Sequence, residues 1–216
     1  MASAMAAVEG GAQRIELCSD LNVDGLTPPM AQISELRERF PALRIHVLIR
    51  PREGDFVYRE DELRTMESDI RAAVEAGATA IVSGALTEDG DIDIAATRRL
   101  IAAAAGLPFT FHRAFDNVRD MEQALLTLHD LGTARVLTSG GAATAEAGIS
   151  VLRRLVELEA LTILPGGGVN SANAARILRE TGATEIHGSC SRPLPDGQRR
   201  TSADEVREVL RALSSL

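Results

Sequence analysis

The chain has 216 residues, 45% of them apolar and 25% charged, a composition that is ordinary for a globular protein and excludes general disorder. A formal net charge of -8 argues against a nucleic-acid-binding protein, which would show a basic stripe. No apolar run approaches the roughly 18 residues needed to cross a bilayer, and the first residues lack the regions of a secretory signal, so we expect no membrane partner.

Two residue types narrow the choice further. The two cysteines, Cys18 and Cys190, are too few for a disulfide framework, which favours a reducing, cytoplasmic location. All 23 basic residues are arginines. Mechanisms that need a lysine, such as Schiff-base aldol chemistry and P-loop phosphate binding, are therefore excluded.

Apolar periodicity predicts helices and strands in alternation along the chain. Residues 2–9 are expected to form a helix. Seven strands are expected, at 14–18, 44–50, 80–86, 109–115, 135–140, 161–165 and 185–190. Helical stripes separate them, of which Leu63, Met66 and Ile70 form the clearest. This alternation predicts a parallel sheet in a single α/β domain that spans residues 1–216.

The strands are of two kinds, and their order predicts a TIM (β/α)8-type barrel whose first strand is missing. Strands of one kind follow a helix-ending glycine, as at Gly77, and the strands between them have a different lead-in. The first strand present, 14–18, is of the glycine kind, so a complete barrel would need a strand upstream of Met1. Such a gap would expose two strand edges, which tend to pair with other chains, so we expect either a homo-oligomer or a protein of marginal stability.

The first two strands carry candidate site residues. Glu16 and Cys18 have the parity that points into a barrel, where a carboxylate needs a partner and indicates function. Cys18 is either a small buried apolar residue or a metal ligand. Arg50 and Arg52 flank a proline after the second strand. They form either a positive rim for a carboxylate or phosphate, or surface ion pairs with acidic neighbours such as Asp55.

The strongest candidate centre is the stretch Phe109–Asp116. Its phenylalanines alternate as on a strand with one apolar face, while His112 lies on the other face, with Arg113 and Asp116 at the exit. A purely structural strand has little need of such an end, so we interpret it as part of an active or binding site. His46, deeper in the second strand, is expected to pack in the core.

A glycine-rich turn follows the sixth strand. Gly166, Gly167 and Gly168 form either an anion cradle before a helix, at the position where barrels often hold phosphate, or a simple flexible turn. Ser139, at the end of the preceding strand, would add a donor there. The segment 191–200, rich in proline, glycine and arginine, is expected to be a loop.

Taken together, these motifs resemble the CutC copper homeostasis proteins. The resemblance covers nearly the whole chain and rests on Ile15-Glu16-Leu17-Cys18, Ile49-Arg50-Pro51-Arg52 with Gly54-Asp55-Phe56, Gly84–Gly90, Phe111–Asp116, Arg135–Gly140 and Pro165–Gly168. It implies a cytoplasmic TIM barrel associated with copper handling, with a pocket at the strand exits. Around that pocket it places Glu16, Arg50, Arg52, His112, Arg113, Asp116, Ser139 and His187. Copper in the family is attributed to a pair of cysteines, of which Cys18 matches one and the other lies on the strand missing here.

Three functions are therefore weighed. The first is a cytoplasmic copper homeostasis protein of the CutC type that binds copper weakly or indirectly, because a single thiolate such as Cys18 is a poor copper(I) site unless another ligand, such as His112 or His187, assists. The second is an enzyme acting on a small anionic or phosphorylated metabolite, in which the arginines after the second strand hold the anion, a histidine serves as acid or base and Glu16 orients it. The third is an incomplete barrel that serves as an interaction module.

Overall fold

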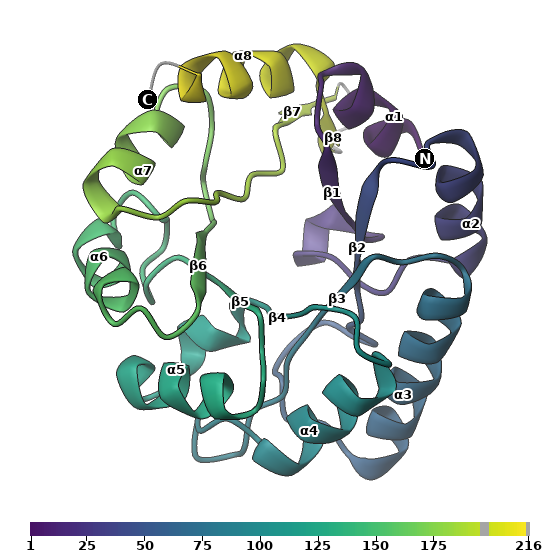
Figure 1. The fold of residues 1–216 in the computed structure, drawn as a ribbon, viewed down its shortest axis with the longest axis vertical. Helices are drawn as coiled ribbons and strands as arrows, with labels where there is room; N and C mark the ends of the chain where they lie inside the picture. The colour runs from purple at the N-terminus through teal and green to yellow at the C-terminus, as the bar shows by residue number, and fades with distance from the viewer. Residues whose placement is uncertain (195–198, 215–216) are drawn as a thin grey trace.

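Six parallel strands form one curved sheet in the computed structural model, which describes residues 1–194 and 199–214 (Figure 1). In sheet order, which is also chain order, they are β1 (Arg14–Leu17), β2 (Arg44–Leu48), β3 (Ala80–Ser83), β4 (Phe109–Phe111), β5 (Arg135–Thr138) and β6 (Thr162–Pro165). The predicted TIM-type α/β class is confirmed, in the form of a curled half-barrel.

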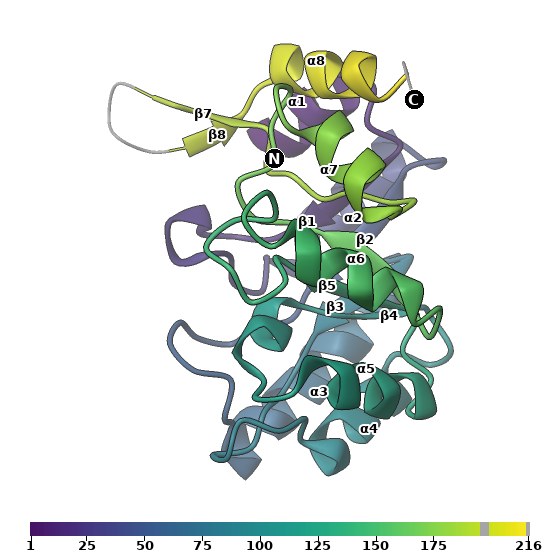
Figure 2. The same cartoon turned by 90° about the vertical axis from the view of Figure 1, so that its left-hand side faces the viewer.

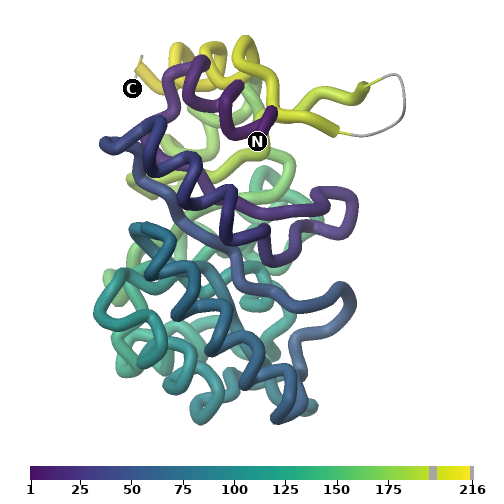
Figure 3. Tube along the Cα trace, turned by 90° about the vertical axis from the view of Figure 1, so that its right-hand side faces the viewer, coloured from purple at the N-terminus to yellow at the C-terminus, as the bar shows by residue number. Residues whose placement is uncertain are grey.

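Helices cover the outer face of this sheet (Figures 1 and 2). They are α1 (Ala2–Glu9), α2 (Met30–Arg39), α3 (Glu60–Glu75), α4 (Ile94–Ala103), α5 (Met121–Asp130), α6 (Ile149–Glu157), α7 (Ala174–Thr181) and α8 (Ala203–Leu213), with short 3-10 helices η1 (Leu21–Val23) and η2 (Arg113–Asn117). Figure 3 shows α1 beside α8, so the first and last helices pack together on one side of the fold. Within the described residues, no helix is both long and apolar enough to cross a membrane.

The helices form where apolar stripes and capping side chains coincide. On α3, Leu63, Met66 and Ile70 lie on one face and are buried against the sheet. Burial of such side chains contributes about 1.5–3 kcal/mol each. The carboxylates of Asp93 and Asp120 accept backbone N–H groups in the first turns of α4 and α5, which fixes where these helices begin.

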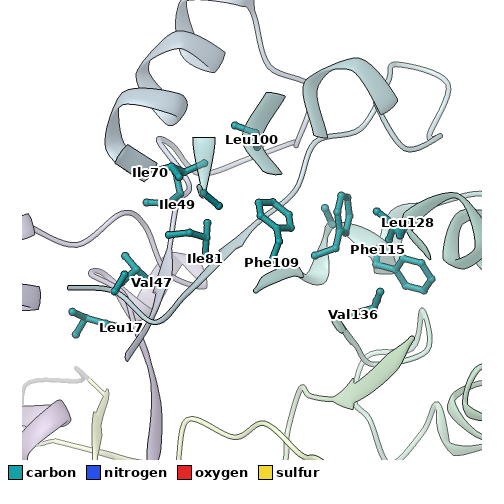
Figure 4. Close-up of a cluster of buried hydrophobic side chains, with 14 of the residues drawn as sticks. Leu17, Val47, Ile49, Ile70, Ile81, Leu100, Phe109, Phe115, Leu128 and Val136 are labelled. Carbon is teal, nitrogen blue, oxygen red and sulfur yellow. The ribbon is translucent and has the colours of Figure 1, made fainter. Parts of the chain in front are cut away.

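The main core lies between the sheet and the helices (Figure 4). Its central row consists of register partners on neighbouring strands: Leu17, Val47, Ile81 and Phe109. Because side chains alternate along a strand, the other parity, which includes Glu16, points to the inside of the half-barrel.

The prediction of a strand at 185–190 is wrong. This segment runs beside β6, and the His187 N–H donates to the Pro165 carbonyl oxygen at 2.9 Å. One such bond does not make a ladder, and β1 pairs only with β2 in the part of the chain that the structure describes. The segment therefore lacks the neighbour on its other side that would hold it as a strand.

Ion pairs hold the start of this segment in place of a strand ladder. The Glu185 carboxylate accepts from Arg14 on β1 at 2.7 Å and from Arg135 on β5 at 2.9 Å. Burial opposes ionisation of Glu185, but the hydrogen bonds from the two guanidinium groups outweigh it, so its pKa is lowered. The Glu185 carboxylate thus links β1 and β5, which are not neighbours in the sheet.

The prediction of a loop over 191–200 is also wrong. Strands β7 (Ser191–Pro193) and β8 (Arg199–Thr201) pair in antiparallel fashion. This hairpin projects from the body of the protein (Figure 2), and residues 195–198 lie outside the described part of the chain.

Candidate functional site

A cavity of about 1010 Å³ opens at the C-terminal ends of the strands. The segments after β1, β2, β4, β5 and β6 contribute to it, and those after β1 and β2 project to the same side as the β7–β8 hairpin (Figures 2 and 3). Its polar lining includes Glu16, Asp24, Arg50, His112, Arg113, Asp116, Asn170, His187 and Glu205. This is the end of a TIM-like fold at which ligands are bound.

Asp116 is the centre of the hydrogen-bond network on the β4–β5 side of the cavity. Its Oδ1 accepts from Thr138 Oγ1 at 2.5 Å and from the N–H groups of Ser139 and Gly141 at 2.9 and 3.1 Å. Its Oδ2 accepts from Arg113 Nε at 2.7 Å and from Ser139 Oγ at 3.1 Å. A carboxylate offers about four lone-pair positions. Because all are engaged, the geometry gives Asp116 a positioning role.

Arg113 extends from this network into the cavity. Its Nε is fixed by Asp116, and its Nη2 donates to Ser139 Oγ at 3.1 Å. Its Nη1 has no hydrogen-bond partner among the described residues, and its side chain is 39% exposed. A Cβ built on Gly167 would lie 3.5 Å from the Arg113 Cζ, so the guanidinium lies against the glycine-rich turn. A fixed guanidinium with an open donor suits a carboxylate or phosphate.

The glycine-rich turn after β6 supports the cavity wall, but it does not lead straight into a helix. Gly167 and Gly168 have φ values of 100° and 70° and line the cavity, whereas Gly166 packs against a leucine of β5. The Ser171 N–H near the start of α7 donates to Glu205 at 3.1 Å. A carboxylate of the protein itself therefore occupies that donor. An anion here would depend on Arg113 and the turn itself.

Arg50, on the segment after β2, also lines the cavity and is 7% exposed. Its Nη1 donates to the carbonyl oxygens of Val23 and Gly25 at 2.6 and 3.2 Å, and its Nη2 donates to that of Gly54 at 3.2 Å. Its Cζ lies 5.2 Å from the centre of the Phe56 ring. The guanidinium thus clamps the segments after β1 and β2 together.

Arg52 does not line the cavity. Its Nε donates to Glu62 at 2.6 Å and its Nη2 to Asp55 at 3.0 Å, and its Cζ lies 5.2 Å from the Tyr58 ring. The bond from Arg52 lowers the pKa of Glu62. Arg52 was interpreted either as part of an anion-binding rim or as a partner in surface ion pairs, and its contacts are those of an ion pair.

His112 directly follows β4, which ends at Phe111, four residues before the predicted end of the strand. Its Nδ1 accepts the Ala114 N–H at 3.2 Å, which turns the chain into η2. The ring lies 4.9 Å from Phe56 and 5.9 Å from Phe111. Burial, followed by the charge of Arg50, lowers the pKa of His112 to about 3. At neutral pH the ring is therefore a neutral hydrogen-bonding group.

Glu16 and His187 come together from opposite ends of the chain. His187 Nδ1 lies 3.7 Å from Glu16 Oε2, and the two side chains are 31% and 16% exposed. Both line the cavity. A carboxylate beside an accessible imidazole is an arrangement that orients the ring for proton transfer. The structure thus brings these two predicted residues together, in reach of solvent.

A second cavity, of about 590 Å³, lies between β1, α1, α8 and the segment before the hairpin. Cys18, Cys190, His46 and His187 line it, and both cysteines are free. Burial, followed by the charge of Glu16, raises the pKa of Cys18 to about 12. Burial also raises the pKa of Cys190 and lowers that of His46 to about 4.

This donor set does not fit a preformed metal site. Among residues 1–194 and 199–214, no three His, Cys, Asp or Glu side chains converge within reach of one ion. The soft ligand that copper(I) selects is the thiolate, and Cys18 is held as the thiol. Cys18 therefore lies near Glu16, but the described residues place no set of further metal ligands around it.

Phe56 and Glu205 are among the cavity residues that reasoning from the sequence missed. Phe56 contacts both Arg50 and His112 but occurred only as part of a family motif. Glu205 binds the Ser171 N–H from a distant helix. An acidic residue in the first turn is typical of any helix, so Glu205 carried no signal that could have identified it.

Comparisons with known proteins give a consistent picture. The model of a family described as the CutC family matches residues 1–192. A Bacteroides fragilis protein named as a CutC family protein is 46% identical over 197 residues, which cover 90% of this chain and 78% of that protein. A human protein named copper homeostasis protein cutC homolog is 47% identical over 189 residues, covering 87% of this chain and 69% of that protein.

Solved structures agree with the fold. The putative copper homeostasis protein CutC from Streptococcus agalactiae superposes with a TM-score of 0.79 at 38% identity, covering 82% of this chain and 88% of that one. Thiamine phosphate pyrophosphorylase from Pyrococcus furiosus superposes with a TM-score of 0.62 at 18% identity, covering 99% and 88%. At that identity the second similarity extends to the fold alone.

Proposed function

Because the chain belongs to the CutC family, we propose that it serves copper homeostasis in the cytoplasm through a small, phosphate-bearing ligand bound at the strand ends. The name of the human relative supports the first part, and two free cysteines fit a reducing compartment. The observation that carries the second part is Arg113, held by Asp116 and Ser139 against Gly167 with one donor open.

The chemistry of this wall favours an anion. The turns after β5 and β6 meet Arg113 with glycine backbone, which a ligand can approach closely because no side chains project from it. On another part of the lining, Glu16 and His187 would supply an acid–base pair. In this form the protein is an enzyme-like receptor for a phosphorylated metabolite, and the phosphate fixes one end of the ligand.

Calorimetric titration with methyl phosphate tests this proposal. Arg113→Gln should weaken binding at least about tenfold, which is the lower range for loss of a hydrogen bond to a charged group. Arg119→Gln is the matched control, since Arg119 also pairs with an aspartate, Asp91, but lies outside the cavity lining. Equal affinities of the two variants, or no binding by the unaltered chain, would remove the site.

Direct copper binding is a second candidate because Cys18, Cys190, His46 and His187 border one cavity. An ion entering there must displace the proton of a thiol whose pKa is about 12. We therefore expect the apparent copper(I) affinity to rise about tenfold per pH unit near neutrality if one thiolate forms.

Competition against a chromogenic copper(I) chelator measures this affinity at several pH values. Cys18→Ser should abolish the pH-dependent binding, and the same stoichiometry and pH profile in this variant would exclude Cys18 as a ligand. Cys190→Ser then shows whether the second cysteine contributes.

A further inference from the structure

Two buried side chains of the cavity lining, one on the segment after β2 and one directly before Arg113, carry hydrogen-bond donors that have no acceptor. Arg50 and His112 are 7% and 4% exposed, so both are more than nine-tenths buried. Arg50 Nε and His112 Nε2 have no hydrogen-bond partner in the part of the chain described by the structure. Buried polar atoms are nearly always paired, so two unpaired ones at the same cavity need an explanation.

The positive charge of Arg50 is also unusual, because it is buried without an acidic partner among the described residues. Three of the four N–H groups on its terminal nitrogens donate to backbone carbonyl oxygens, whereas Nε has no acceptor at all. No acidic side chain of the described residues lies within ion-pair distance of this guanidinium, although the protein carries more acidic than basic groups. A buried charge without a counter-charge is unfavourable unless a ligand supplies one.

The state of the His112 ring follows from its neighbours. Because Nδ1 accepts the Ala114 N–H, the proton of the neutral ring lies on Nε2, which is therefore a donor. Gly84 packs so closely on the other side that a Cβ there would lie 2.9 Å from Nδ1. The ring is thus held in one orientation, with its open nitrogen on the edge away from Ala114.

One aromatic side chain packs against both residues. The Phe56 ring lies 4.9 Å from the His112 ring and 5.2 Å from the Arg50 Cζ, and all three residues line the cavity. The backbone of Phe56 is anchored, since its carbonyl oxygen accepts the Leu86 N–H at 2.9 Å. A rotation of the Phe56 side chain would therefore leave this backbone bond in place.

We propose that Arg50 and His112 form a carboxylate subsite covered by Phe56, so that the ligand of this cavity carries a carboxylate in addition to its phosphate. The inference rests on the proposed function, whose phosphate end lies at Arg113. Two single donors with one positive charge match the two oxygens of a carboxylate. A phosphate would leave oxygens unpaired in this apolar corner, and a cation would be repelled by Arg50.

Calorimetry with three probes tests the subsite: methyl phosphate, glycolate and 2-phosphoglycolate. The unaltered chain should bind 2-phosphoglycolate at least about tenfold more tightly than methyl phosphate. His112→Asn retains an acceptor for Ala114 but withdraws the Nε2 donor, so it should remove this advantage and leave methyl phosphate binding unchanged. His129→Asn, at an exposed position on α5, is the matched control.

A second variant, Phe56→Ala, tests the subsite independently in case His112→Asn does not fold. Phe56→Ala removes the cover while retaining both donors, so glycolate should bind more tightly to it than to the unaltered chain. Unchanged or weaker glycolate binding would contradict the role given to Phe56. Folding of each variant is checked by its thermal unfolding.

The outcomes separate the two proposals. If methyl phosphate binds but the carboxylate adds no affinity, or adds affinity that His112→Asn retains, the subsite is refuted and the phosphate site stands. If methyl phosphate fails while glycolate binds in a His112-dependent way, the subsite stands and the proposed function falls. If no probe binds, both are refuted.

Discussion

Replacement of Asp116 by Asn should destabilise the protein by about 2 kcal/mol. If the amide oxygen takes the place of Oδ1, the amide nitrogen faces the Nε–H of Arg113, and the 2.7 Å charge-assisted bond becomes a contact between two donors. Asp116 is 9% exposed, so water cannot easily replace the lost acceptor. A hydrogen bond to a charged group contributes about 1.5–3 kcal/mol, and we take the lower half because Arg113 is partly solvated.

Urea unfolding followed by circular dichroism at neutral pH measures this loss. Asp91→Asn is the control, because Asp91 and Arg119 form an exposed pair whose loss should cost less than about 1 kcal/mol. Asp116→Asn should also weaken methyl phosphate binding, since it releases Arg113. A loss of stability no greater than that of Asp91→Asn would refute the positioning role of Asp116.

Two further predictions concern pH and packing. His46 and His112 have pKa values near 4 and 3 in the folded protein against 6.5 for the free side chain, so the stability from keeping them neutral is complete above pH 6.5. For each of these histidines, the free energy of unfolding should fall by about 1.4 kcal/mol per pH unit between pH 6.5 and the pKa in the folded protein. A urea midpoint that stays constant from pH 6.5 to 4 would contradict this. Gly148→Ala should cost more than about 2 kcal/mol, because its Cβ would lie 1.8 Å from the Ser139 carbonyl oxygen. Gly188→Ala, whose nearest atom would be 3.3 Å away, should cost less than half as much, and equal melting temperatures would rule out this explanation.

The positions of six strands and of the α3 stripe could be predicted because they depend on local periodicity. Leu63, Met66 and Ile70 are all buried as that periodicity requires. The segment 185–190 has the same lead-in and alternation as a strand, but a strand also needs a neighbour, which periodicity does not reveal. The single domain and the homo-oligomer stay predictions, and sedimentation velocity checks the second.

The candidate site was predictable where side-chain parity decides it. Parity placed Glu16 inside the barrel, where it meets His187. It could not show that Arg52 would turn away to Glu62, because that depends on the path of the loop between them. Nor could it show that Arg50 would be buried without a carboxylate, since that depends on which elements pack around it.

The most direct test of an anion site at the strand ends is a titration of the ¹⁵N-labelled protein with methyl phosphate, followed by NMR. We expect saturable shifts of the Arg113 Nε–H signal and of the backbone amides of 141–143 and 167–169, which line the same wall of the cavity. Amides of α3 and α4, on the outer face, should not move. Shifts confined to the outer helices, or no saturable shift at Arg113, would contradict the proposed site.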